Sequence, residues 1–312
     1  MKRLIVSVMS LPLVVALGGC STFRQDPAAT VNDDEISDDV LQDELDDVEG
    51  SEAYRTFLEA QLGRVSKGSG TGTVATPFVS ALLTERVYLT LIEQALDAED
   101  ASVSEAQLAE ARQQLEDEGG EGLGDLPRDQ RDALARRVAL LQALQAEAVP
   151  AYFERNADDF DTLCVSHVLV GTEDRSVAEA EARAEELAER IDAGERFRRL
   201  ARTESDDETA AAQRGDLGCG TRGRFVAPFE DAAFQLEVGE VSAPVRTEFG
   251  FHLIRLRERT ASGLEEVDDA VQQRLIADLA AEADVSVDPR YGEWTESESG
   301  SFQIVAPSEG GA

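Results

Sequence analysis

Hydrophobic residues recur every three or four positions through most of residues 32–160, which is the spacing of one buried face of an α-helix. The series over residues 82–96 is the clearest, and glycine-rich breaks at 68–72 and 119–124 separate the predicted helices. Helices of this kind bury one stripe against one another. The pattern predicts an all-α module over 32–160, and nothing in it suggests catalysis.

The pattern changes after Asp161. Residues 163–170 form a β-branched run of strand length, and Ser176 with Glu179 forms a capping box that predicts a helix ending near Gly194. The other elements predicted here are an amphipathic piece at 197–201, a glycine-rich segment at 215–223 that is a loop or a strand, a short helix at 228–234, and strands at 241–245 and 251–256. This order predicts a compact α+β unit over 162–259.

The chain ends in two segments of different character. Val267, Val271, Leu275 and Leu279 predict one more amphipathic helix within 263–287. The rest of the chain, 288–312, is rich in Gly, Ser and Glu, which predicts a loosely ordered tail.

The chain is strongly acidic. It has 64 Asp and Glu against 29 Lys and Arg, and therefore a formal net charge of −35. A phosphate backbone would repel such a chain, because nucleic-acid affinity depends on cationic contacts. Nucleic-acid binding is therefore excluded. An integral membrane protein is excluded as well, since no apolar run reaches the roughly 20 residues that a bilayer span needs.

The first twenty residues have the layout of a secretory signal. Lys2 and Arg3 precede an apolar run over 4–17, and two small residues then lead to Cys20. Residues 17–20 resemble a bacterial lipobox, in which the cysteine is lipidated and becomes the mature N-terminus. The alternative is an ordinary signal peptide cleaved near Cys20. We expect an exported protein anchored to the membrane through Cys20, with residues 21–31 as a flexible tether.

Two cysteines remain once Cys20 is set aside. An even count in an oxidising compartment favours a disulfide between Cys164 and Cys219, worth about 4 kcal/mol in the chain-entropy model. Two free buried thiols are the alternative. A third interpretation, a zinc site made by both cysteines with His167 and His252, is disfavoured because residues three apart on a strand point to opposite faces.

Six short blocks in the α+β unit resemble a parvulin-type peptidyl-prolyl isomerase, in family order and at family spacing. They are His167–Val170, Ser205–Asp207, Gly215–Gly218, Pro228–Phe234, Gly239–Val245 and Phe249–His252. The helical flanks and the lipobox look like the SurA and PrsA type of extracytoplasmic foldase. The resemblance implies a parvulin-like domain, with a small antiparallel sheet flanked by helices, joined to an all-α module. It also implies that the helix within 263–287 packs back on that module.

The resemblance also implies roles for individual residues. It assigns the pocket for the proline ring to Leu217, Phe225 and Phe229, for which ordinary core packing is the alternative. It places Asp207 opposite the prolyl amide; the alternative is that Asp207 is part of an exposed acidic turn with no role in catalysis. It makes His167 and His252 members of a hydrogen-bond network, and it places Thr247 beside them.

Prolyl isomerisation requires neither nucleophile nor cofactor, so no cofactor or metal is expected. The site must hold the ring and favour the twisted amide over the planar one, across a barrier near 20 kcal/mol. The loop at 171–175 lacks the basic cluster that phosphate recognition needs, so phosphoserine-proline specificity is not expected. Cys219 also replaces the bulky aromatic residue often found just after the Gly-Asp-Leu-Gly turn.

The sequence therefore predicts a lipid-anchored foldase outside the cytoplasmic membrane. Its partners would be unfolded or nascent secreted polypeptides with X-Pro bonds. The rival hypothesis is a catalytically weak parvulin-fold holdase. Two departures keep it open: Cys219, and Phe225, which stands where the family often has methionine. A structural or adhesion lipoprotein is disfavoured, because it would not need a matched isomerase core.

Overall fold

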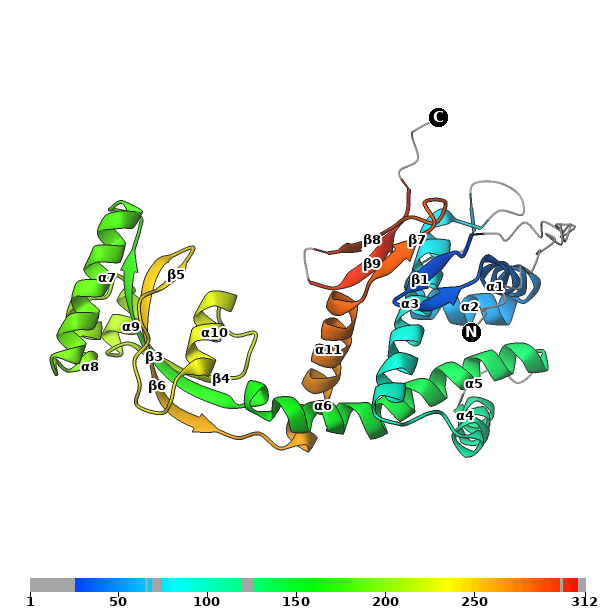
Figure 1. Ribbon diagram of the computed structural model, residues 1–312, viewed down its shortest axis with the longest axis horizontal. Coiled ribbons are helices and arrows are strands. Elements are labelled where there is room, and N and C mark those ends of the chain that lie inside the picture. Colours follow the sequence, from blue (N-terminus) through cyan, green and yellow to red (C-terminus); the bar gives the residue numbers. More distant parts are fainter. Residues whose placement is uncertain (1–25, 65–66, 69–73, 119–125, 298–299, 308–312) are drawn as a thin grey trace, which may run out of the picture.

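The computed structural model describes residues 26–307 except 65–66, 69–73, 119–125 and 298–299, and it places them in two units (Figure 1). The signal segment with Cys20 and most of both glycine-rich breaks lie outside the described residues. The helices of the larger unit are α1 (Asp38–Gly50), α2 (Glu52–Leu62), α3 (Thr76–Ala98), α4 (Glu105–Glu118), α5 (Arg128–Ala143), α6 (Val149–Asn156) and α11 (Leu264–Glu282). A π-helical turn (Leu144–Ala148) joins α5 to α6, and a 3-10 turn (Ala157–Phe160) follows α6. Among the described helices, none combines the length and apolarity that crossing a bilayer requires.

Helix α3 is the centre of the helical unit. Leu82, Leu83 and Val87 on α3 are completely buried, as the helical spacing predicts. Helix α11 packs against α3 and α6 and buries Val271 and Leu275 in a second core cluster, with Ile92 and Leu96 of α3. The helical unit is therefore closed by a segment that follows the α+β unit in sequence.

The helical unit also contains strands, so the prediction of an all-α module is wrong in this respect. A three-stranded antiparallel sheet has the order β2-β1-β7, formed by β1 (Ala29–Val31), β2 (Asp34–Ile36) and β7 (Val285–Val287). The expected tether at 21–31 is therefore wrong for its last residues. Three-residue strands carry little periodic signal, and this sheet depends on the pairing of β1 with β7, which lies far away in the sequence.

The expected loose tail is also wrong for most of its length. Strands β8 (Glu293–Glu296) and β9 (Phe302–Val305) form an antiparallel pair that packs on α3. Ile304 is buried, its N–H donates to Thr84 Oγ1 at 2.9 Å, and the Trp294 ring lies 5.8 Å from that of Tyr88. Apolar residues spaced among Gly, Ser and Glu are thus enough to anchor the segment to a distant helix.

The smaller unit is the α+β unit. Its four-stranded antiparallel sheet has the order β4-β3-β6-β5, formed by β3 (Thr162–Gly171), β4 (Asp216–Gly220), β5 (Val245–Thr247) and β6 (Gly250–Thr260). Its helices are α7 (Val177–Asp192), α8 (Phe197–Glu204), α9 (Glu208–Ala212) and α10 (Ala227–Gln235). The capping box of Ser176 and Glu179 is confirmed at the start of α7.

Two predicted elements of this unit need a more exact description. The glycine-rich segment at 215–223, predicted as a loop or a strand, contains strand β4, because β3 supplies a partner that pairs with it despite the glycines. The strand predicted at 241–245 is reduced to an isolated bridge between Val241 and Arg255, and the true edge strand begins at Val245. The paired central strands β3 and β6 carry the chain into and out of the unit, since Thr162 lies opposite Thr260.

Candidate active site

The two histidines of the chain lie side by side in the middle of the α+β sheet. His167 on β3 and His252 on β6 are 4% and 5% exposed. Their Nδ1 atoms are 3.1 Å apart, and the rings stack with centroids 5.3 Å apart. Residues more than eighty positions apart are thus joined by a buried hydrogen bond.

A carboxylate and a hydroxyl complete this row of side chains at its two ends. His167 Nε2 lies 2.9 Å from Asp207 Oδ2, and His252 Nε2 lies 2.8 Å from Thr247 Oγ1. The Phe249 N–H donates to the Thr247 hydroxyl at 3.2 Å. We call Thr247, His252, His167 and Asp207 the histidine chain.

With both histidines neutral, every hydrogen bond in the histidine chain has one donor and one acceptor. His167 Nε2–H donates to the Asp207 carboxylate, and His252 Nδ1–H donates to the bare Nδ1 of His167. The Thr247 hydroxyl then donates to His252 Nε2. Ionised Asp207 therefore sets both tautomers.

The pKa shifts agree with this assignment. Burial, with the neighbouring His167 ring, lowers the pKa of His252 to about 4. Burial also lowers the pKa of His167, against the opposing effect of Asp207. Burial raises the pKa of the Asp207 carboxyl, but the Ala210 N–H and His167 outweigh it and hold that pKa below its usual value. At neutral pH the histidine chain is thus two neutral rings and one carboxylate.

Local structure explains why Asp207 faces His167. Asp207 is the N-cap of α9, where its Oδ1 accepts the Ala210 N–H at 2.9 Å while Oδ2 is left for the histidine. Ser205 Oγ accepts the N–H groups of Leu169 at 3.0 Å and Asp207 at 3.3 Å, which ties the turn to β3. Asp207 is therefore held in a fixed position, unlike a side chain on a free acidic turn.

Gly215 is needed for the same arrangement. Its φ is +85°, and a Cβ placed there would lie 2.5 Å from the His167 carbonyl oxygen. The Gly215 carbonyl accepts the His167 N–H at 2.8 Å. A larger residue would push this turn away from the strand that carries the histidine.

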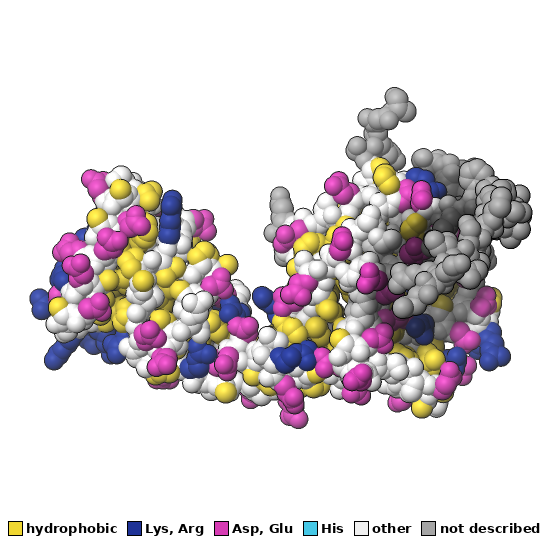
Figure 2. Space-filling view, in the orientation of Figure 1, with side chains coloured by type: hydrophobic (Ala, Val, Ile, Leu, Met, Phe, Trp, Pro, Cys, Tyr) yellow, Lys and Arg dark blue, Asp and Glu magenta, His cyan; other side chains and the backbone are white. Residues whose placement is uncertain are grey.

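Leu217, Phe225 and Phe229 come together beside the histidine chain, in an apolar cluster with the underside of the sheet. The Phe229 ring is perpendicular to His252, with centroids 5.4 Å apart, and lies 4.9 Å from the Phe225 ring. Phe229 is only 3% exposed, whereas Leu217 and Phe225 are half-buried. Figure 2 shows hydrophobic side chains gathered on this unit between α7 and α10. Leu217 and Phe225 therefore form the accessible part of the cluster, and Phe229 supports them from below.

Two side chains that help to place Phe225 were not singled out from the sequence. The buried Glu230 accepts the N–H groups of Gly223 at 2.9 Å and Phe225 at 2.8 Å, which holds the loop after β4. Arg224 donates to the backbone carbonyls of β4. A buried acid inside the apolar helix α10 is the signal that could have pointed to Glu230.

Cys164 and Cys219 form a disulfide, with an S–S distance of 1.95 Å. The zinc interpretation therefore fails, because both candidate thiolates are used in that bond. Within the described residues, no group of three or more His, Cys, Asp or Glu is placed to hold a metal ion. In the loop at 171–175, Arg175 is paired with Asp206, so its charge is already compensated.

Comparison with known proteins identifies the class of this unit. Residues 152–260 match the family model described as PPIC-type PPIASE domain, so this part of the chain is a parvulin-type domain. A Foldase protein PrsA from Halalkalibacterium halodurans is 37% identical over 152 residues, which cover 45% of this chain and 43% of that protein. A Chaperone SurA from Chromohalobacter salexigens is 40% identical over 121 residues, which cover 36% of this chain and 28% of that protein.

The similar solved structures include the parvulin NmPin of Nitrosopumilus maritimus, which is 40% identical to this chain, with a TM-score of 0.27. The match covers 31% of this chain and 97% of NmPin. The family resemblance inferred from the six blocks is confirmed by the family model and the named relatives. A mixed fold with a parvulin-type domain is confirmed as well. The chain nevertheless matches less than half the length of these two curated relatives.

Proposed function

We propose that this chain is a peptidyl-prolyl cis/trans isomerase that assists the folding of secreted polypeptides outside the cytoplasmic membrane. The observation that carries the proposal is the histidine chain, fully hydrogen-bonded and neutral in its rings, directly beside the apolar cluster of Leu217, Phe225 and Phe229. It lies inside the segment that matches the isomerase family model. The foldase and chaperone names of the relatives support unfolded polypeptides as partners.

The geometry suits a reaction that needs no bond to be broken. A planar prolyl amide is charge-separated by resonance, and twisting the C–N bond removes that resonance. An apolar surface under the proline ring favours the less polar, twisted amide relative to water. Leu217 and Phe225 would hold the ring, and the Asp207 carboxylate would lie opposite the amide. The neutral histidines would fix Asp207 and the sheet beneath it.

The location and the anchor are parts of the same proposal. The relatives named foldase and chaperone favour action on exported proteins, and the basic, apolar and small segments that end at Cys20 have the layout of a lipoprotein signal. Mass spectrometry of the protein made in a bacterial host tests the anchor. The expected result is a diacylglyceryl group on an N-terminal Cys20, and a mature chain that begins elsewhere would contradict it.

The test of activity is a protease-free isomerisation assay on X-Pro peptides with the chain from Ser21 onward. We expect acceleration by the wild type and a loss of roughly tenfold or more in Phe225→Ala, since a half-buried ring that binds substrate is removed. Val238→Ala, which trims an exposed apolar side chain of the same unit, serves as the control and should keep full activity. A folded, oxidised wild type without acceleration would instead support the holdase hypothesis, which suppression of client aggregation would then test.

A further inference from the structure

Leu217 lies at an irregularity in the sheet. Strands β3 and β4 pair Val165 with Gly218 and Ser166 with Asp216, so Leu217 is the extra residue and has no partner across the ladder. Such a β-bulge redirects a side chain and leaves its position less well defined by strand pairing. Among the strands that the structure describes, β4 is an edge strand that pairs with β3 alone. Other contacts must therefore hold this side chain beside the histidine chain.

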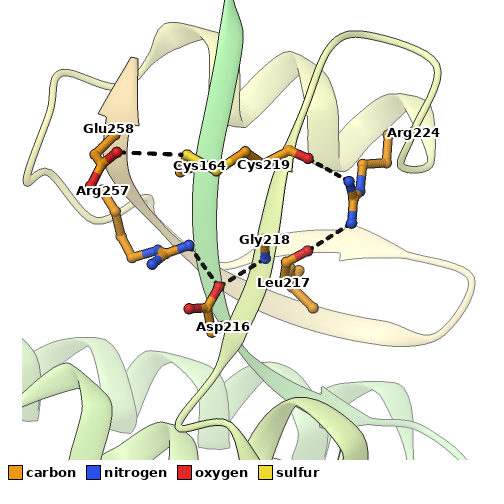
Figure 3. Close-up of a disulfide and its surroundings, with 8 residues drawn as sticks. All are labelled: Cys164, Asp216, Leu217, Gly218, Cys219, Arg224, Arg257 and Glu258. Carbon is orange, nitrogen blue, oxygen red and sulfur yellow. Dashed lines mark hydrogen bonds and ion pairs between the residues drawn. A yellow bond between two sulfur atoms is a disulfide. The ribbon is translucent and has the colours of Figure 1, made fainter. Parts of the chain in front are cut away.

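The disulfide is one of these contacts. Cys164 and Cys219 face each other directly across β3 and β4, and Cys219 is two residues beyond Leu217 (Figure 3). Cys164 lies on the same strand as His167, three residues before it. The bond therefore links the strand that carries the proposed ring contact to the strand that carries the histidine.

Arg224 holds the opposite edge of β4. Its guanidinium donates to the carbonyl oxygens of Cys219 and Leu217, the latter at 3.0 Å (Figure 3). These carbonyls are two residues apart and both point away from β3, which is the side left free at a sheet edge. The same guanidinium lies 5.6 Å from the centre of the Phe225 ring. Arg224 thus connects the bulged residue to the next aromatic residue of the apolar cluster.

Asp216, the residue before Leu217, is held in place as well. Asp216 Oδ1 accepts the Gly218 N–H at 2.8 Å and an Arg257 N–H at 2.6 Å. Together these contacts surround Leu217, and none of them is made to the reacting amide. Their common effect is to define where Leu217 and Phe225 lie relative to His167.

We propose that the Cys164–Cys219 disulfide and Arg224 are positioning residues for the proline-binding surface, holding the bulged Leu217 and Phe225 against the histidine chain. The proposal rests on the proposed isomerase function, which it deepens. Removing the disulfide should weaken substrate binding more than the isomerisation step, because the apolar surface loosens while the histidine chain stays intact. Misplacing a substrate-contacting group by even about 1 Å can cost up to about a hundredfold.

The experiment compares wild type with Cys164→Ser/Cys219→Ser and with Arg224→Lys, each in the chain from Ser21 onward. For the double variant we expect KM for an X-Pro peptide to rise roughly three- to tenfold and kcat to change by less than about twofold. Arg224→Lys should give a smaller rise in KM, since one ammonium cannot bond both carbonyls in the fork geometry of a guanidinium. In the double variant the Leu217 methyl NMR signals should shift or broaden, while the imidazole signals of the two histidines keep their positions.

The controls separate positioning from simple loss of stability. Leu187→Val removes one methylene from the core under α7, away from β4, and should lower stability without raising KM. If the double variant does not fold, the wild type is used instead: it is folded in its oxidised form and then treated with a dithiol. The dithiol reduces the Cys164–Cys219 bond to two thiols and is itself oxidised to a disulfide. An active wild type whose KM and Leu217 signals do not change on loss of the disulfide would overturn the positioning role. An inactive wild type would overturn the isomerase proposal, and the Leu217 signals would still decide whether the disulfide positions that residue.

Discussion

His167 and His252 are the only histidines in the chain, and each makes hydrogen bonds with both ring nitrogens. Their imidazole NMR signals can therefore be followed without interference from other histidines. We expect both to titrate below 6.5, with His252 near 4, because burial disfavours the charged ring. A titration from pH 8 to pH 3.5 measures both values, and a midpoint above 6.5 for either ring would contradict the neutral histidine chain.

The same shift makes stability depend on pH. An unfolded His252 takes up a proton near pH 6.5, whereas the native ring does so only near 4, so the unfolded state binds more protons between these values. Above about pH 6.5, His252 makes its full contribution to the free energy of unfolding. This contribution decreases as the pH falls, by about 2 kcal/mol at pH 5. Urea unfolding at pH 7 and pH 5 should therefore show a larger loss in wild type than in His252→Gln. Equal losses would show that His252 has no such shift.

The Asp207 carboxylate is predicted to raise the pKa of His167. The carboxylate favours the charged ring, so Asp207→Asn should lower the pKa of His167 further below that of the wild type. The amide can still cap α9, which makes this change milder for the fold than Asp207→Ala. NMR titration of His167 in both variants is the measurement, and an unchanged or raised pKa would mean that the contact to Asp207 is not made in solution.

Among the helices and strands, those whose formation depends on residues close together in the sequence could be predicted. The capping box before α7 and the long strand β3 follow from local pattern, and the six family blocks contain His167, Asp207 and His252 of the histidine chain. The glycines of β4 leave loop and strand both open in the sequence, and pairing with β3 makes the segment a strand. The bulge at Leu217 and the Arg224 contacts depend on backbone groups brought together by folding, which no spacing in the sequence encodes.

The hairpin of β8 and β9 gives a prediction at this scale. Ile304 is 5% exposed in the helical core, whereas its neighbour Val305 is 48% exposed. Ile304→Ala should lower the free energy of unfolding by about 2–4 kcal/mol, because it leaves a cavity against α3. Val305→Ala should change it by less than about 0.5 kcal/mol. Urea unfolding followed by the fluorescence of Trp294, the single tryptophan of the chain, measures both, and equal effects would mean that the hairpin does not dock.

For the whole molecule, the two units have separate hydrophobic cores. The core of the helical unit contains Leu82, and the core between the sheet and α7 contains Leu253; both side chains are fully buried. The α+β unit is inserted into the helical unit, and its two connections lie side by side at Thr162 and Thr260. Helix α11 can therefore pack against α3 and α6 whether or not the inserted unit is folded. We therefore expect two separable unfolding transitions.

The chain carries a natural reporter in each unit, with Trp294 in the helical unit and both histidines in the parvulin-type domain. Leu253→Ala should move the transition seen by the imidazole NMR signals to lower urea, by about 3 kcal/mol of stability, and leave the Trp294 fluorescence transition in place. Leu82→Ala should do the reverse, because the cavity then lies in the helical core. If either substitution moves both transitions together, the units unfold cooperatively. The contacts at the junction, such as those of Arg222 with Asp159 and Arg259 with Asp161, would then couple them.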